Sequence, residues 1–213
     1  MAARCRILIA DDHRLIADAC KKLLEPEFDV VGVVEDGRAL LKATAELRPN
    51  VVILDIAMPL LNGLDAGEQI KKRYRAIKLI FLTMTVAPEV AAEAFRRGAS
   101  GYVLKHCSFD ELVVAVRRVL RGQSYLSPLI TQDTVSFLLR SNTTLFGKKR
   151  ISSRQSEVLQ LLAEGKSMKE VAYSLNMKPG TVAFHKYRIM ENLGCKTNAE
   201  LIKYAIKNHI IDS

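Results

Sequence analysis

The sequence predicts an α/β domain with a doubly wound, five-stranded parallel sheet, followed by a second, smaller all-α domain. Over residues 1–121, short apolar runs alternate with longer segments of helical period. That alternation is typical of a parallel sheet with helices on both faces. From Ile151 onward the periodicity is helical only. A chain of 213 residues is long enough for two such domains.

Five apolar runs predict the five strands. They cover residues 6–10, 30–34, 51–54, 79–82 and 101–104, and helical segments such as 15–24, 39–47 and 112–120 lie between or after them. Pro49, Gly63 and Gly98 stand at boundaries between these segments. Five such units favour the flavodoxin-like strand order 2-1-3-4-5.

The segment 122–147 breaks this pattern with Gly122, Ser124, Ser127 and Pro128. A helix is predicted at 129–139, and a polar run at 141–144 and a basic run at 148–150 follow it. We therefore expect three parts: a domain at 1–121, a partly helical linker at 122–147 and a second domain at 148–213.

Capping signals define the helices of the second domain. Three capping boxes precede apolar-periodic runs, and they pair Ser152 with Gln155, Ser167 with Glu170, and Thr197 with Glu200. Pro179 suits the first turn of a further helix. Four helices with short turns at Gly165 and Asn176 predict a compact helix-turn-helix domain.

The net charge of +9 is concentrated in that second domain. Residues 148–213 carry 12 basic and 6 acidic side chains, which suits a module that binds a polyanion such as nucleic acid. No apolar run approaches the length of about 18 residues that a membrane span needs. Cys5, Cys20, Cys107 and Cys195 are scattered, so we expect reduced thiols in a cytoplasmic protein.

Polar residues follow several of the predicted strands. Asp11 and Asp12 follow the first strand, and Asp55, Thr83 and Lys105 stand at the ends of the third, fourth and fifth. Because ligands bind beyond the carboxyl ends of such strands, these side chains should share one crevice. Three carboxylates repel each other unless a cation joins them, and oxygen ligands suit Mg²⁺. A carboxylate can also attack phosphorus to give an aspartyl phosphate.

The same segments resemble a known family. The residues that carry the resemblance are ILIADDH, VVILDIAMPLLNGLDA, IFLTM and GASGYVLK, which are similar to the signatures of response-regulator receiver domains over residues 5–121. The resemblance implies that Asp55 is the phospho-acceptor and that a histidine kinase is a partner. It implies Asp12 as a direct Mg²⁺ ligand assisted by Asp11, and the carbonyl of Ala57 as a further ligand beside Asp55.

Three further roles are implied by the resemblance. Thr83 would move toward the phosphoryl group, Tyr102 would follow by turning inward, and Lys105 would hold a phosphoryl oxygen. The chain departs from the family pattern at three positions. Leu60 replaces the usual glycine after Met-Pro, Met84 stands where a small residue is common, and His106 replaces the common proline.

The C-terminal segment resembles the LuxR/FixJ type of helix-turn-helix. The residues that carry it are SEVLQLLAEGKSMKEVAYSLNMKPGTVAFHKYRIMENLG. The resemblance implies that residues 179–193 form the recognition helix, which enters the major groove of DNA. Its base-reading positions fall on Ala183, Phe184 and Tyr187, and Arg188 could contact phosphate or guanine. Phosphate contacts are expected from Lys178, Thr181, Lys186 and Lys196.

Helical periodicity places Val182, Ile189 and Leu193 on one side of this helix. That side should pack against Val158, Leu162, Val171 and Leu175, leaving Ala183, Phe184, Tyr187, Arg188 and Glu191 outward. His185 is expected to be a packed or capping residue. Lys178 is a poor N-cap, so the helix start is expected to be loosely held.

Three functions fit these observations. The first is a phosphorylation-gated transcription factor that dimerises through the receiver, through the final helix at 199–206, or through both. The second is a DNA-binding regulator whose receiver is constitutively active, an alternative that Met84 and His106 keep open. The third is a phosphatase with an aspartyl intermediate, which would need an acid two residues after the nucleophile. Ala57 occupies that position, so the third is disfavoured.

Overall fold

The computed structural model describes residues 4–106, 109–141 and 151–211. Its first part contains a parallel sheet in the order β2-β1-β3-β4-β5-β6. The strands are β1 (Arg6–Ala10), β2 (Asp29–Val34), β3 (Val51–Leu54), β4 (Lys78–Thr83), β5 (Gly101–Leu104) and β6 (Tyr125–Leu126). The five predicted strands and their order are confirmed, but the prediction of only five strands was wrong.

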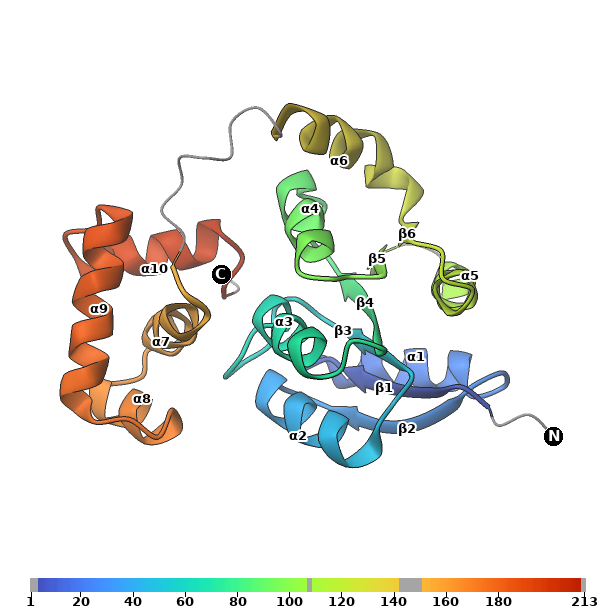
Figure 1. Cartoon of the computed structure of the whole chain (residues 1–213), viewed down its shortest axis with the longest axis horizontal. Helices are drawn as coiled ribbons and strands as arrows, with labels where there is room; N and C mark the ends of the chain where they lie inside the picture. The colour runs from blue at the N-terminus through green and yellow to red at the C-terminus, as the bar shows by residue number, and fades with distance from the viewer. Residues whose placement is uncertain (1–3, 107–108, 142–150, 212–213) are drawn as a thin grey trace.

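Helices cover both faces of the sheet (Figure 1). They are α1 (Arg14–Leu24), α2 (Gly37–Leu47), α3 (Gly63–Arg73), α4 (Pro88–Arg96) and α5 (Phe109–Leu120). Side chains alternate along β1, so Ile7 and Ile9 pack with α1 and α5. Leu8 and Ala10 face the opposite way, into the cluster that includes residues of α2, α3 and α4.

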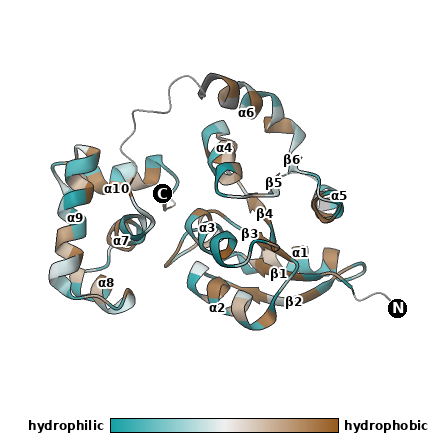
Figure 2. Ribbon diagram, viewed as in Figure 1, coloured by the Kyte–Doolittle hydropathy of each residue, from teal (hydrophilic) through white to brown (hydrophobic). Residues whose placement is uncertain are grey.

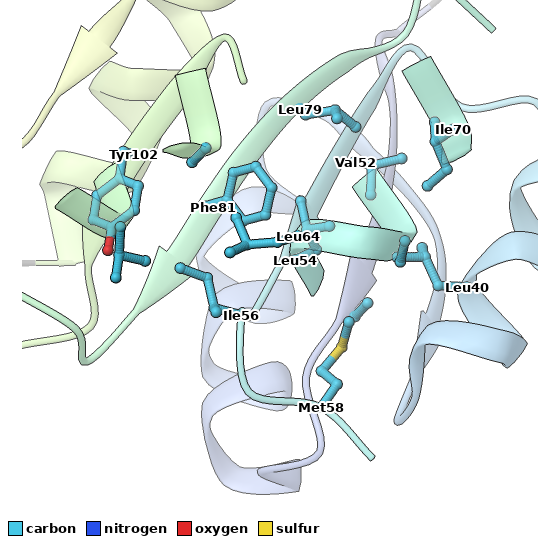
Figure 3. Close-up of a cluster of buried hydrophobic side chains, with 14 of the residues drawn as sticks. Leu40, Val52, Leu54, Ile56, Met58, Leu64, Ile70, Leu79, Phe81 and Tyr102 are labelled. Carbon is cyan, nitrogen blue, oxygen red and sulfur yellow. The ribbon is translucent and has the colours of Figure 1, made fainter. Parts of the chain in front are cut away.

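The interior strands are buried on both faces, which explains why they read as continuous apolar runs. All four residues of β3 are buried, and Figure 2 shows the central strands as mostly hydrophobic. Figure 3 shows the cluster under α2, α3 and α4, where Val52, Leu54, Leu79 and Phe81 of the sheet meet Leu40 of α2. This core holds the carboxyl ends of the strands in fixed positions.

The segment predicted as a linker contributes to the first domain. The backbone of β6 continues the sheet, since the N–H of Tyr125 donates to the carbonyl of Ser100 at 3.0 Å. The predicted helix at 129–139 is confirmed as α6 (Pro128–Ser141), which contacts α4. Cys107, the polar positions 142–144 and the basic run 148–150 lie outside the described residues.

The second domain is helical, as predicted. Its helices are α7 (Ser153–Ala163), α8 (Met168–Ser174), α9 (Pro179–Leu193) and α10 (Asn198–Lys207). Gly165 and Asn176 both take positive φ in the predicted turns. In the part of the chain that is described, no helix has the combined length and apolar character needed to span a bilayer. Cys5, Cys20 and Cys195 are free thiols.

Two of the three predicted capping boxes are complete. Ser152 and Ser167 each accept a hydrogen bond from the third helical residue, whose side chain accepts from the N-cap backbone in return. The third prediction was half wrong. Thr197 accepts from the N–H of Glu200, but the Glu200 carboxylate accepts from the N–H of Lys196 at 2.6 Å instead. The carboxylate still satisfies a backbone donor at the start of α10, one residue early.

Candidate functional site: an acidic pocket and an exposed helix

The acidic pocket lies where neighbouring strands end at one edge of the sheet. Register pairs Ala10 with Leu54, and the N–H of Asp55 donates to the carbonyl of Ala10 at 2.9 Å. On the other side, the N–H of Lys105 donates to the carbonyl of Thr83 at 2.9 Å. Parallel pairing therefore brings the residues that follow β1, β3, β4 and β5 to the same edge.

One lysine joins two of the carboxylates. Lys105 Nζ lies 2.5 Å from Asp55 Oδ2 and 2.8 Å from Asp11 Oδ2, and all three side chains are almost completely buried. Asp55 Oδ1 accepts a hydrogen bond from the N–H of Ile56 at 2.6 Å. A buried charge is tolerated when it is paired and hydrogen-bonded, and these contacts supply that pairing.

Burial and charge act in opposite directions on the pocket. Burial raises the pKa of Asp55 to about 6, although the neighbouring ammonium of Lys105 opposes that rise. Burial alone would lower the pKa of Lys105, but Asp55 and Asp11 outweigh it and the pKa is raised. The lysine therefore stays protonated at neutral pH and attracts anions to Asp55.

Four residues could hold a cation in this pocket. Asp11, Asp12, His13 and Asp55 each offer one ligand atom, and these atoms lie within 4.8 Å of one another. Asp11 Oδ2 is fully buried and, apart from the ion pair with Lys105, has no hydrogen-bond donor among the described residues. A hard cation such as Mg²⁺ matches this oxygen-rich set.

His13 was not predicted as part of the site. Its ring Nδ1 lies 3.0 Å from Asp12 Oδ1, and its backbone N–H donates to Asp11 Oδ1 at 2.9 Å. The side chain is more than half exposed, so it lies at the mouth of the pocket. Its position directly after the two aspartates was the only signal in the sequence.

Gly63 lets α3 begin against the pocket. A Cβ at this position would lie 1.8 Å from the carbonyl oxygen of Asp55, so a side chain cannot be accommodated without moving the backbone. The preceding Asn62 is the N-cap of α3 and accepts from the N–H of Asp65 at 2.9 Å. Asn62 and Gly63 therefore determine where α3 begins after the loop that follows Asp55.

Thr83 and Tyr102 are linked through a third residue. Thr83 is buried and its Oγ1 accepts from the N–H of Thr85 at 3.2 Å. Tyr102 is also buried, and its hydroxyl donates to the carbonyl of Thr85 at 2.8 Å. Burial raises the pKa of Tyr102, so the phenol remains a neutral donor. A shift of Thr83 would therefore move the Thr85 backbone to which the Tyr102 hydroxyl is hydrogen-bonded.

Two of the unusual residues do not fill the pocket. Met84 is 63% exposed, and His106 is exposed as well. Neither one replaces a polar group in the cluster. The third, Leu60, has a left-handed backbone with φ 65° and lies partly buried against the apolar cluster of the second domain.

The predicted recognition helix α9 packs as expected. Val182 and Ile189 are completely buried and Leu193 partly, in one cluster with Val158, Leu162, Val171 and Leu175. No side chain caps the start of α9 at Lys178, and Pro179 occupies the first turn. The poor N-cap predicted from the sequence is therefore confirmed.

The outward face of α9 carries two exposed aromatic rings. Phe184 is 60% and Tyr187 67% exposed, and Arg188 forms an ion pair with Glu191 at 3.2 Å on the same face. Lys178, Thr181 and Lys196 are exposed, whereas Lys186 is only half-exposed. Ala183 is half-buried, so its prediction as fully outward was wrong in part. His185 is half-buried with its ring against Phe184.

Sequence reasoning missed an interface between the two domains. Ser156, Glu157 and Gln160 of α7 are buried polar residues that bond to the first domain. Figure 1 shows α7 beside α3, with α9 on the side of α7 away from the sheet. A polar face on a helix normally indicates solvent, so the three polar side chains on one side of α7 gave no distinct signal of this contact.

Two family models match the chain. A model described as "Response regulator receiver domain" matches residues 7–117, and one described as "Bacterial regulatory proteins, luxR family" matches residues 149–205. Among curated proteins, the chain is similar to the oxygen regulatory protein NreC of Staphylococcus carnosus, at 33% identity over 97% of this chain and 99% of that protein. NreC of Staphylococcus aureus matches with the same identity and coverage.

Solved structures of RcsB are also similar. One structure of the Salmonella typhimurium response regulator RcsB has a TM-score of 0.66 and 29% identity, covering 97% of this chain and 98% of that chain. A structure of two RcsB dimers bound to two parallel DNAs has a TM-score of 0.60 and 28% identity, covering 96% of this chain and 98% of that chain. The two family models and the full-length relatives agree on the same two-domain arrangement. The chain is thus a DNA-binding two-component response regulator, a member of the family that joins a receiver domain to a LuxR-type helix-turn-helix domain.

Proposed function

We propose that Mg²⁺-dependent phosphorylation of Asp55 by a histidine kinase gates the binding of DNA by α9. In this proposal residues 1–121 receive the phosphoryl group, residues 122–147 connect, and residues 148–213 bind DNA. The protein would act in the cytoplasm, where its DNA target lies. The observation that carries the proposal is the convergence of Asp11, Asp55 and Lys105 at adjoining strand ends.

The residues of the pocket have complementary tasks in this reaction. A carboxylate oxygen of Asp55 would form the bond to phosphorus as the donor's bond to phosphorus breaks. Lys105 would pair with a phosphoryl oxygen, and Thr83 would hydrogen-bond to another. Bound Mg²⁺ would offset the negative charge that builds up during the transfer. Asp12, Asp55 and the carbonyl of Ala57 would hold this ion, with Asp11 assisting.

The response would then pass to a two-state receiver. Phosphorylation at Asp55 would draw Thr83 toward the phosphoryl group and shift the Thr85 backbone to which Tyr102 donates. This coupling is supported by the two hydrogen bonds of the Thr85 backbone, whose N–H donates to Thr83 and whose carbonyl accepts from Tyr102.

DNA would be contacted by the outward face of α9. Phe184 and Tyr187 are exposed aromatic residues for which the described domain offers no packing partner that buries them. Ala183, Phe184 and Tyr187 would read base edges, and Arg188 would contact phosphate or guanine. The exposed Lys178, Thr181 and Lys196, together with the half-exposed Lys186, would contact phosphates.

The active form would be a homodimer. The face of α10 formed by Ala199, Ile202 and Ile206 is an apolar hollow edged by Lys203 and Lys207. A second copy of α10 is a suitable occupant, because a twofold axis would set two α9 helices on successive half-sites. The structure of two RcsB dimers bound to two parallel DNAs supports this proposal by analogy.

Acyl-phosphate labelling tests the assignment of Asp55. The full chain is incubated with radiolabelled acetyl phosphate and Mg²⁺, and incorporation is compared with that of Asp55→Asn. We expect the asparagine variant to take up no label, because an amide is not a nucleophile for phosphorus. Asp18→Asn, an exposed substitution of the same kind on α1, should label like the natural chain. Label retained on Asp55→Asn would refute the assignment.

A further inference from the structure

The loop of residues 55–62 connects the acidic pocket to the DNA-binding domain. Its first residue is Asp55. Ile56 and Met58, both labelled in Figure 3, anchor it in the apolar core of the receiver, and Leu61 belongs to the same core. Leu60 points the other way and packs against the apolar cluster of the second domain. A single short loop therefore has side chains in two cores.

Leu60 has a backbone conformation that leucine rarely adopts. Its φ of 65° lies in the left-handed region, where the Cβ of an L-residue comes too close to the following carbonyl oxygen. Such a residue keeps this conformation only where its surroundings hold it. The loop by itself does not favour the shape that it has in the full chain.

Helix α7 supplies the contacts that hold the loop. The N–H of Leu60 donates to Glu164 Oε1 at 3.0 Å, and the N–H of Asn62 donates to Gln160 Oε1 at 2.7 Å. The amide of the same Gln160 donates through Nε2 to the carbonyl of Met58 at 2.9 Å. Gln160 is completely buried, so water cannot replace these bonds.

A second group of contacts shows that the docking is specific. Asp65 of α3 accepts hydrogen bonds from Ser156 of α7 at 2.6 Å and from Arg97, at the end of α4, at 2.6 Å. Glu157 of α7 bonds to Arg38 of α2 at 2.7 Å. The bonds of Ser156 and Glu157 cross the interface, whereas the Arg97–Asp65 pair lies within the receiver. Separating the domains would leave Ser156 and Glu157 to find new partners.

We propose that docking of α7 and binding of a divalent cation in the acidic pocket favour each other, because both require the 55–62 loop in one ordered conformation. This rests on the proposed function, in which Asp55 and the carbonyl of Ala57 hold the ion. A loop that α7 has already ordered loses less conformational freedom when the ion binds. By reciprocity the ion stabilises the docked domain to the same extent. Docking leaves the outward face of α9 open, so it acts on the pocket without covering the DNA-reading surface.

The test compares Mg²⁺ affinity among full-length variants altered at Gln160 of α7 or at Glu164, the C-cap of α7. Gln160→Ala removes all three hydrogen bonds of the Gln160 side chain to the loop, which join it to the N–H and Nδ2 of Asn62 and to the carbonyl of Met58. Glu164→Ala, a milder change at a half-exposed site, removes the acceptor of the Leu60 N–H. Gln132→Ala, at an exposed position on α6, is the matched control. Titration calorimetry with MgCl₂ gives the affinity. Hydrogen exchange at the amides of Leu60 and Asn62, measured without Mg²⁺, reports the release of the loop.

We expect faster exchange at these amides and a Mg²⁺ affinity about fivefold weaker in Gln160→Ala, a smaller loss in Glu164→Ala, and no change in Gln132→Ala. Equal or tighter Mg²⁺ binding by Gln160→Ala, with its loop amides released, would overturn the coupling and leave the ion site intact. Unchanged exchange in both α7 variants would overturn it as well. If the natural chain binds no Mg²⁺, the ion site of the proposed function fails together with the coupling.

Discussion

At the scale of single residues, the pocket depends on one ammonium shared by two buried carboxylates. Lys105 pairs with Asp55 and Asp11, and the three side chains are almost inaccessible to water. Removing one partner of a buried pair is strongly destabilising because it leaves an uncompensated charge. Lys105 already balances part of the negative charge in the pocket, so a cation or anion that enters must change the existing ion pairs. Burial raises the pKa of Asp55, which shows how little water is present to assist that change.

A single tyrosine tests how α9 reads DNA. Tyr187 is exposed on the outward face of α9 at a predicted base-reading position. Tyr187→Ala should weaken binding to a specific duplex by about tenfold, because base contacts give specificity. Binding to random-sequence duplex should change by less than about twofold, because phosphate contacts are untouched. Fluorescence anisotropy with both duplexes gives the two affinities.

Tyr173→Ala is the matched control for this measurement. Tyr173 is a 91% exposed tyrosine on α8, outside the recognition helix. Its replacement should leave the ratio of specific to non-specific affinity unchanged. If Tyr187→Ala weakened both duplexes equally, Tyr187 would be a backbone contact and its assignment to base reading would be wrong.

At the scale of elements, the short helix α8 depends on its cap. It has seven residues, and isolated helices of that length are not stable in water. Ser167 accepts from the N–H of Glu170, and Glu170 accepts from the N–H of Ser167, so two exposed donors are satisfied. The hydrogen bonds at Ser167 also hold the pKa of Glu170 below its usual value.

Loss of that cap should lower stability measurably. Ser167→Ala should reduce the free energy of unfolding of the DNA-binding domain by about 1 kcal/mol, observed by urea denaturation of the full chain. Ser167→Asp, which keeps a capping oxygen, should lose much less. Equal stability of the alanine variant and the natural chain would show that packing against α9, and not the cap, determines the start of α8.

The elements that the sequence predicted well have periodic and buried patterns. The runs at 6–10, 51–54 and 101–104 coincide with strands because, apart from the exposed Arg6, their residues are nonpolar and buried. By contrast, β6 has only two residues, and polar residues precede it in the sequence. It is a strand because it pairs with the edge of β5. Pairing with a remote edge leaves no local periodicity to detect.

The acidic pocket was also largely predictable, since strand ends alone bring Asp11, Asp55 and Lys105 together. The donor that bonds to the Glu200 carboxylate was not predictable. Whether that donor is the N–H of Lys196 or that of Thr197 depends on the local backbone geometry. The role of Leu60 was visible only as a departure from the usual glycine. Its backbone conformation and its partner on α7 depend on how two domains meet.

At the scale of the whole molecule, the receiver with its acidic pocket and the helix α9 lie on opposite sides of α7 (Figure 1). This helix contributes Val158 and Leu161 to the core of the second domain and presents Ser156 and Gln160 to the receiver. Figure 1 shows the resulting arrangement, in which the receiver, α7 and α9 follow one another. Any movement of the 55–62 loop would act directly on the second domain, because Leu60 and Asn62 are hydrogen-bonded to Glu164 and Gln160.

The most direct test of phosphorylation-gated DNA binding is the affinity of the full chain for a duplex selected from a random pool, measured with and without acetyl phosphate and Mg²⁺. Asp55→Asn under both conditions is the control. We predict that the phosphorylated chain binds the selected duplex at least about tenfold more tightly, and that Asp55→Asn shows no such gain. Equal affinity of the natural chain in the two conditions would contradict the gate and favour a receiver that is active without phosphorylation.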